Sequence, residues 1–214
     1  SLGLFYSTIT DFCGFLVNEG EYKLMGLAAF GKPIYADFML QNILCHSGHR
    51  IRLDLAWFDF THTPERSFSD KFISKFGQPI SFKKVSTADN EDFLRAANLA
   101  KSAQVVVETV IQSLVEWGVN KYECAGITIT GGVAQNSLAM GNLIRHLPPH
   151  IVVTIPPSPG DSGAAIGAAH FGKVLASNQL LHTNKLYFGG QPQPSHFNIL
   201  DTMFERVSGP NEMD

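Results

Sequence analysis

Charged side chains are scarce in this chain: Asp, Glu, Lys and Arg make up 16% of its 214 residues, against 44% hydrophobic residues. A disordered chain has the opposite balance, so the composition predicts a folded domain with a sizeable core. The formal net charge is only -3, which argues against a general nucleic-acid binder. No apolar run approaches the roughly 20 residues needed to cross a bilayer, so we expect neither nucleic acid nor membrane as a partner.

Cysteine is also rare: the chain has three, Cys13, Cys45 and Cys124. They are odd in number and far apart in the sequence. This predicts reduced thiols in a cytoplasmic protein rather than a disulfide framework. Residues 1–5 contain neither an initiator Met nor a basic stretch ahead of the apolar side chains, which is not typical of a signal peptide. We expect the chain to be a piece of a longer protein.

Hydrophobic periodicity predicts helices, bounded by glycine, proline and polar residues, over residues 2–17, 21–29, 35–45, 68–76 and 91–117. Alternating residues predict a strand or hairpin arm over 50–60. Two strand–glycine-turn–helix units follow, with strands at 125–130 and 151–155 and helices at 134–146 and 162–175. Such units in tandem indicate an α/β architecture, and residues 184–214 predict a linker or truncated tail.

The first candidate site is the turn after the strand at 125–130, where Gly131 and Gly132 open a helix and Asn136 follows. Glycines at this place let a phosphate approach backbone N–H groups, and the helix dipole favours the anion. Asn136 could hydrogen-bond a phosphate or an acyl group. The alternative is a tight turn that needs glycine only for its geometry, and the pattern leaves both open.

The second candidate is the loop at 156–162, which leads into a helix rich in Gly and Ala. Asp161 lies where a helix N-cap would be, and capping is the simpler interpretation of its carboxylate. The alternative is a metal or nucleotide ligand that projects into a cleft. Because ligands of α/β sheets bind at the carboxyl ends of strands, we expect Asp161 on the same edge as Gly131 and Gly132.

The third candidate is the segment 18–28, in which Glu21 and Lys23 fall between glycines. The lysine could pair with a phosphate, and the glutamate could hold ribose hydroxyls. The alternative is an ordinary first helical turn, in which Glu19 and Glu21 complement the helix dipole.

Two further patterns predict no site. Residues 26–32 match most of a P-loop, but Pro33 replaces the hydroxyl residue that would bind Mg²⁺, and no strand precedes them. Residues 45–49 hold one Cys and two His, without a second cluster at finger-like spacing. We expect a polar surface loop there.

Taken together, the three candidate motifs resemble the nodulation-type O-carbamoyltransferase family. A segment like residues 1–7 there leads into Gly14-Phe15 and then the motif at 18–28. A Gly-Gly-Val-Ala-x-Asn turn follows, here residues 131–136, and later a Gly-Asp-x-Gly loop, here 160–163. Related tRNA threonylcarbamoyltransferases share the last two motifs, and actin-like ATPases share them more loosely.

The resemblance implies an α/β fold of the actin-like, RNase H-type class, with two lobes around a nucleotide cleft. Residues 1–183 would be the second lobe, with an inserted α+β segment at about 35–90. An N-terminal lobe and a C-terminal adenylate-forming domain of the same parent would lie outside this chain. We therefore expect the isolated polypeptide to be inactive.

The activity that the resemblance implies is a biosynthetic one. Carbamoyl phosphate and ATP would give carbamoyl-adenylate, and the actin-like domain would transfer its carbamoyl group to a small-molecule hydroxyl acceptor. Asp161 would be one ligand of a divalent metal, expected to be iron, with the other ligands outside this chain. Glu21, Lys23, Gly131, Gly132 and Asn136 would lie on the nucleotide side. The alternatives are a non-catalytic actin-like nucleotide-binding scaffold and a tRNA threonylcarbamoyltransferase-like protein.

Overall fold

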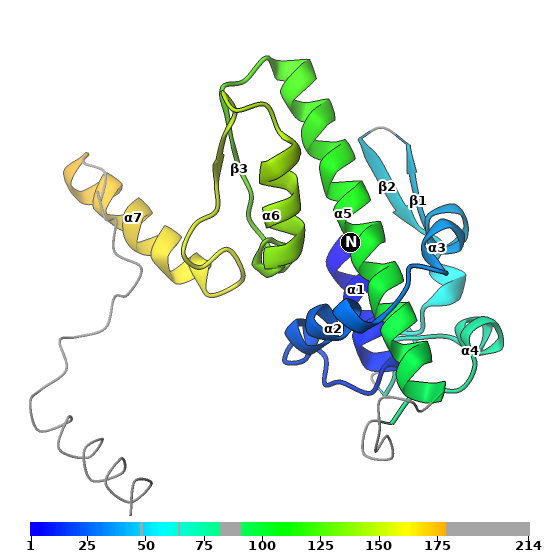
Figure 1. The fold of residues 1–214 in the computed structure, drawn as a ribbon. Helices are drawn as coiled ribbons and strands as arrows, with labels where there is room; N and C mark the ends of the chain where they lie inside the picture. The colour runs from blue at the N-terminus through cyan, green and yellow to red at the C-terminus, as the bar shows by residue number, and fades with distance from the viewer. Residues whose placement is uncertain (48, 64, 82–90, 179–214) are drawn as a thin grey trace, which may run out of the picture. The chain divides into compact units, whose positions relative to one another are not determined.

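A computed structural model describes residues 1–47, 49–63, 65–81 and 91–178 (Figure 1). The chain divides into two compact units, Ser1–Ala169 and His170–Asp214. Only residues 170–178 of the second unit are described. The predicted tail at 184–214 lies outside the described residues.

The first unit is mainly helical. Its elements before the longest helix are α1 (Leu2–Phe12), α2 (Glu21–Leu27), η1 (Ala28–Phe30), α3 (Ala36–Asn42), β1 (Leu44–Ser47), β2 (Arg50–Leu53), η2 (Leu55–Trp57) and α4 (Asp70–Phe76). The elements that follow are α5 (Glu91–Tyr122), β3 (Gly126–Thr128), η4 (Gly132–Gln135), α6 (Ser137–His146), β4 (Val152–Thr154) and α7 (Gly163–Ser177), the last of which continues past Ala169 into the second unit.

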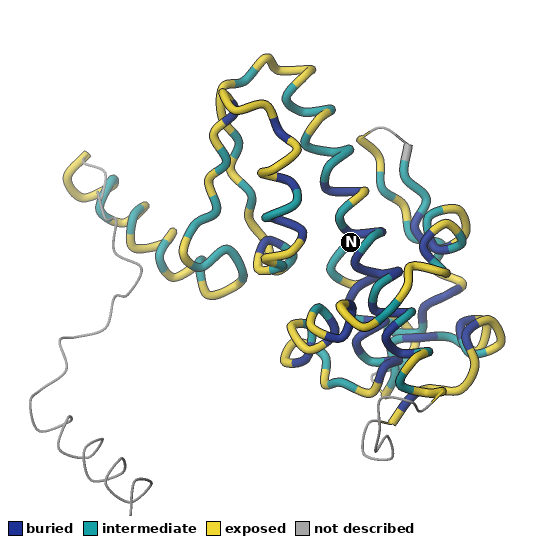
Figure 2. The backbone as a smooth tube through the Cα atoms, viewed as in Figure 1, coloured by how far each residue is buried: buried dark blue, intermediate teal, exposed yellow. Residues whose placement is uncertain are grey.

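Helix α5 is the centre of the first unit, because α1, α2, η1, α3 and α6 all contact it. Its buried residues lie between Ala96 and Ile111, and none is buried from Gln112 to Tyr122 (Figure 2). The buried stripe carries many small side chains, among them Ala96, Ala97, Ala100 and Ala103. Small side chains let neighbouring backbones come close, so several segments can share this one surface.

The segment at 35–90, predicted as an insertion, contains α3, the β1–β2 hairpin, η2 and α4 among its described residues. Phe72 of α4 packs on Phe12 of α1 with ring centroids 4.8 Å apart. The carboxylate of Asp11 accepts hydrogen bonds from the backbone N and the hydroxyl of Ser67, at 2.8 and 2.6 Å. Apolar packing and this polar anchor together fix the segment on α1.

Two predictions for this segment are wrong in their bounds. The helix predicted over 35–45 ends at Asn42, and the strand predicted over 50–60 ends at Leu53. The reason is strand pairing: residues 44–47 pair antiparallel with 50–53, and Leu44 lies opposite Leu53. The side chain of Asp54 then caps η2 by accepting from the N–H of Ala56. The loop expected at 45–49 is thus largely a hairpin, and the ring of His49 stacks on Trp117.

Strands β3 and β4 pair in parallel, with Gly126 opposite Val152 and Thr128 opposite Thr154, and α6 connects them. This confirms the α/β character of the second half of the first unit. Each sheet among the described residues has two strands, so the actin-like assignment stays a prediction. None of the helices in these ranges combines the length and the apolar character that spanning a membrane requires.

The close approach of η1 to α5 predicts a stability effect at Gly31. A Cβ built there would overlap the backbone carbonyl of Ala97, whereas one at Gly26 of α2 meets no atom within 4 Å. We expect Gly31→Ala to lower the free energy of unfolding by about 1–3 kcal/mol or more. The control, Gly26→Ala, should leave it unchanged or raise it by up to about 1 kcal/mol. Urea denaturation measures both, and equal effects would contradict the packing.

Candidate functional site

The glycine turn, defined here as residues 131–136, follows β3 and needs glycine at its first position. Gly131 has φ 96° and ψ 162°, a region that essentially only glycine occupies. Gly132 begins η4, has no positive φ, and leaves open space where a Cβ would stand. The first internal hydrogen bond here joins Ala134 N to Gly131 O, so η4 itself does not use the N–H groups of Gly132 and Val133.

The loop that carries Asp161 lies against this turn. The backbone N of Gly131 donates to the carbonyl of Pro159 at 2.6 Å. A Cβ at Gly160 would lie 3.0 Å from Gln135 Nε2 and 3.9 Å from the Cα of Gly132. The two loops therefore meet at the carboxyl ends of β3 and β4, as the sequence predicts.

Asp161 is exposed, and within the described ranges its carboxylate makes no hydrogen bond. Its backbone carbonyl accepts from the N–H of Ala164. The simpler interpretation, a carboxylate that caps the following helix, thus has no support in the geometry. The side chain is available to a ligand.

Asn136 is the N-cap of α6, with Oδ1 accepting from the N–H of Ala139 at 3.0 Å. The same side chain pairs with the amide of Gln104 on α5. Asn136 Nδ2 donates to Gln104 Oε1 at 2.9 Å, and Gln104 Nε2 donates to Asn136 Oδ1 at 3.0 Å. The Asn136 amide also forms a hydrogen bond with the Tyr6 side chain, so both of its N–H groups have partners inside the protein.

Tyr6 of α1 and Glu108 of α5 complete this buried group. The Tyr6 hydroxyl donates to Gln104 Oε1 at 3.1 Å, and Gln104 Nε2 donates to Glu108 Oε1 at 2.7 Å. Burial raises the pKa of the Tyr6 phenol well above its ordinary value, so the hydroxyl keeps its proton and acts as a donor. We call Tyr6, Gln104, Glu108 and Asn136 the amide network.

Glu21, unlike the glycine turn, has its hydrogen-bonding groups engaged within the protein. The carboxylate of Glu21 accepts from the hydroxyl of Ser7 at 2.7 Å and from the backbone N of Asn18 and Gly20 at 3.0 and 3.2 Å. It therefore closes the loop before α2 and has little capacity left for ribose hydroxyls.

Helix α2 meets the start of α6 through Met25, whose sulfur accepts from the hydroxyl of Ser137. Lys23 lies two residues away, on roughly the opposite side of a helix with about 3.6 residues per turn. Its ammonium stands 5.7 Å from the ring centroid of Tyr22. The nucleotide role of Lys23 stays a prediction.

Metal binding would need more ligands than the described part of this chain brings together. Across the described ranges, no three His, Cys, Asp or Glu side chains cluster in a way that could hold an ion. Sequence reasoning overlooked a His-x-x-x-His spacing at His146 and His150. Pro148 and Pro149 separate the two, and His146 Nδ1 bonds the carbonyl of Asn142. Asp161 alone does not make a metal centre, so no catalytic step is assigned to a metal here.

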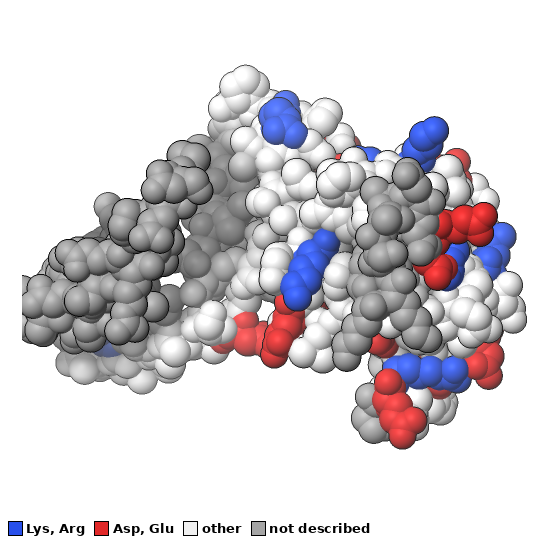
Figure 3. Space-filling view, turned by 60° about the horizontal axis from the view of Figure 1, so that its bottom comes forward, with Lys and Arg blue, Asp and Glu red and all other residues white. Residues whose placement is uncertain are grey.

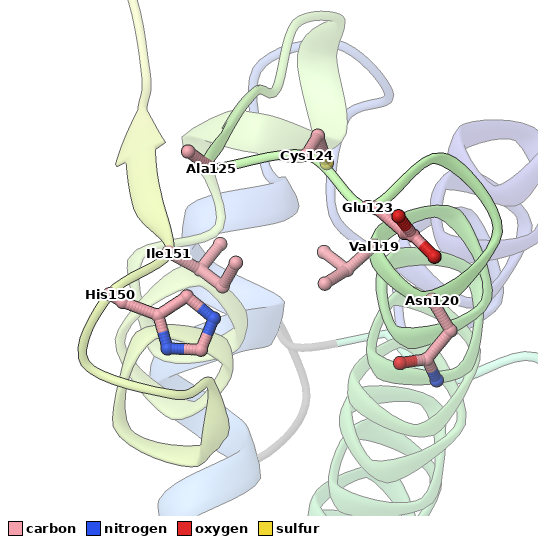
Figure 4. A pocket seen from close by; sticks show the side chains of 7 residues that line it. All are labelled: Val119, Asn120, Glu123, Cys124, Ala125, His150 and Ile151. Carbon is pink, nitrogen blue, oxygen red and sulfur yellow. The ribbon is translucent and has the colours of Figure 1, made fainter.

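A shallow pocket of about 370 Å³ lies at the other end of the strands (Figure 4). It is lined by Val119, Asn120, Glu123, Cys124, Ala125, His150 and Ile151. In Figure 4 the His150 ring and the carboxylate of Glu123 lie on opposite sides of the pocket. Because it is at the amino ends of β3 and β4, this pocket is separate from the glycine turn.

Charge is spread thinly over the surface. On the face in Figure 3, the Lys and Arg side chains are interspersed with Asp and Glu, without a gathering of one sign. This face offers no basic track for a phosphate backbone.

Comparison with known proteins identifies the family. Residues 1–170 match the family model described as carbamoyltransferase N-terminus. The chain is 38% identical over 79% of its length to an uncharacterized protein of Synechocystis sp., of which it covers 26%. It is 30% identical over 84% of its length to the nodulation protein NolNO of Sinorhizobium fredii, of which it covers 23%. An uncharacterized protein of Methanocaldococcus jannaschii is 26% identical over 88% of the chain, which covers 33% of that protein.

The chain therefore belongs to the carbamoyltransferase family, as the motifs at 1–28, 131–136 and 160–163 predict. It spans about a quarter to a third of the length of these relatives.

Sequence reasoning missed the amide network. Its one signal in the sequence is Gln104, a polar residue among the apolar positions of a long helix. A buried amide needs hydrogen-bond partners, and this requirement could have pointed to Asn136.

The contrast between the two glycines gives a test of the turn. Gly131→Ala should lower the free energy of unfolding by about 1–3 kcal/mol, because alanine is strained at this φ and ψ. Gly132→Ala should leave it within about 0.5 kcal/mol, because nothing obstructs the new Cβ. Thermal or urea unfolding distinguishes them, and an equal loss for both variants would contradict this turn geometry.

Proposed function

We propose that this chain is the actin-like part of an ATP-dependent O-carbamoyltransferase that moves a carbamoyl group from carbamoyl-adenylate to an acceptor hydroxyl in biosynthesis. The carbamoyl-adenylate would form from carbamoyl phosphate and ATP in another domain of the same protein. Family membership and the 30% identity to a nodulation protein support the carbamoyl chemistry.

The observation that carries the proposal is the meeting of the glycine turn with the loop of Asp161. Backbone N–H groups at the turn suit an anion such as the adenylate phosphate. The open space at Gly132 leaves room for that anion to approach the backbone. Asn136, the last residue of the turn, would hold the turn in place on the nucleotide side.

The acceptor and the metal are the less constrained parts of the proposal. Asp161, exposed beside the turn, would offer one hard oxygen ligand to a divalent cation. Iron is the metal that the family resemblance implies, with its other ligands outside this chain. Of the cysteines, Cys13 is no nucleophile, because burial raises the pKa of its thiol to about 12.

Activity should be divided between this chain and the rest of the protein. We expect the isolated chain, incubated with carbamoyl phosphate, ATP and a hydroxyl acceptor, to release neither pyrophosphate nor AMP. The full-length protein that carries these residues should release both. Robust turnover by the isolated chain would contradict this division.

Gly132→Ala in the full-length protein separates the two half-reactions. A Cβ there would stand between the anion and the backbone, so transfer should fall by roughly 100-fold. Pyrophosphate release, which reports adenylate formation, should be unchanged. The control is Gly141→Ala in α6, whose Cβ would approach only the Arg145 side chain, at 3.7 Å. Normal transfer by Gly132→Ala would leave the glycines as turn formers and favour a scaffold role.

A further inference from the structure

Gln104 is a polar side chain in the middle of an apolar surface. It is 1% exposed and lies on the stripe of α5 that includes Ala100, Ala103 and Val107. A leucine or methionine would fill the same volume without the cost of burying an amide. Its presence needs a reason other than packing.

Every hydrogen-bonding group of the Gln104 amide is used. Oε1 accepts from Tyr6 and Asn136, and Nε2 donates to Glu108 and Asn136. A buried amide that is fully satisfied in this way is rigid, because each partner restricts its rotation.

The orientation of the amide network follows from one fixed donor. The backbone N–H of Ala139 can only donate, so the Asn136 atom that faces it must be the oxygen. Asn136 Nδ2 then faces Gln104 Oε1, which also receives the Tyr6 hydroxyl. Nε2 of Gln104 is left to donate to Glu108 Oε1. One consistent arrangement thus runs from α1 through α5 to the first turn of α6.

The network ends on the residue that closes the glycine turn. Asn136 is both the last residue of that turn and the N-cap of α6. Helix α1 also contacts η4 directly, with Gly3 close to Val133. The position of the turn relative to the core is therefore set by α5 and α1, not by the turn alone.

We propose that Gln104 is a positioning residue for carbamoyl transfer: by holding the amide of Asn136, it fixes the glycine turn where the adenylate anion binds. The inference rests on the proposed function. Tyr6 and Glu108 hold Gln104 in turn, and none of these three side chains needs to touch the ligand.

The test is Gln104→Met in the full-length protein, a variant of similar shape that keeps helix propensity but loses the amide. Misplacement of reacting groups by about 1 Å can cost roughly 100-fold in rate, so kcat for transfer should fall between about 10- and 100-fold. The KM for the acceptor and the rate of adenylate formation should change little. Tyr6→Phe, which removes the hydrogen bonds of the hydroxyl to Gln104 and Asn136 but leaves both bonds between those two amides in place, should reduce kcat less.

Ser102→Ala is the matched control. Ser102 is also buried on α5, but its hydroxyl accepts from the N–H of Tyr35 and donates to the carbonyl of Asn98. Its loss should lower the melting temperature and leave transfer unchanged. If Gln104→Met reduced transfer no more than Ser102→Ala does, the inference would be overturned.

A double-mutant cycle with Asn136→Ser shows whether Gln104 acts through Asn136. Serine can still cap α6, but it cannot pair with the Gln104 amide. The two substitutions together should reduce kcat no further than Asn136→Ser alone. Additive losses would overturn the inference. A wild-type protein that transfers no carbamoyl group would overturn the proposed function and this inference with it, whereas wild-type transfer that Gln104→Met leaves unchanged overturns the inference alone.

Discussion

Close packing against one side of α5 is the constraint on which the rest of this structure depends. Alanines at 96, 97, 100 and 103 keep the helix surface narrow, so α1, α2, η1 and α3 can all reach it. The approach is closest at Gly31, where the backbone of one segment lies against the carbonyl of Ala97. Larger side chains on this stripe would push the surrounding helices apart. The arrangement of the hydrophobic core therefore depends on the small side chains of the buried stripe of α5.

The same helix also carries the polar connection to the candidate site. Gln104 lies one turn from Ala100 on the buried stripe, and it is the point where α5 contacts the Asn136 amide. A helix held on several sides by its neighbours is a rigid support, and rigid supports keep binding groups in place better than loops do. The burial of α5 thus has a consequence for the glycine turn, although the turn itself is exposed.

The sequence predicted what depends on local pattern and missed what depends on distant partners. The periodicity of residues 91–117 identified α5, and the two strand–turn–helix units identified β3, α6 and β4. The strand at 44–47 is missed, because the local pattern, which predicts a helix over 35–45 and a polar loop over 45–49, does not reveal the strand at 50–53 with which these residues pair. The contacts around the candidate site show the same difference between local pattern and distant partners. The meeting of the Gly131 turn with the Asp161 loop follows from parallel strands, whereas the Gln104–Asn136 pair joins residues 32 positions apart and leaves no local pattern.

Polar groups whose hydrogen bonds are used within the protein hold the fold, and polar groups without such bonds can act on a ligand. Glu21 has three donors on its carboxylate, so this acidic residue of the most specific motif serves the backbone of its own loop. The amide of Asn136 is likewise engaged inside the protein, by Gln104, Tyr6 and the N–H of Ala139. The N–H groups at the start of η4 and the carboxylate of Asp161 are not used in this way. Under the proposed function, donors that hold an anion, next to one oxygen ligand for a cation, would suit the binding of a charged acyl-adenylate better than the removal of a proton. The deprotonation of the acceptor would then fall to residues other than those of the glycine turn.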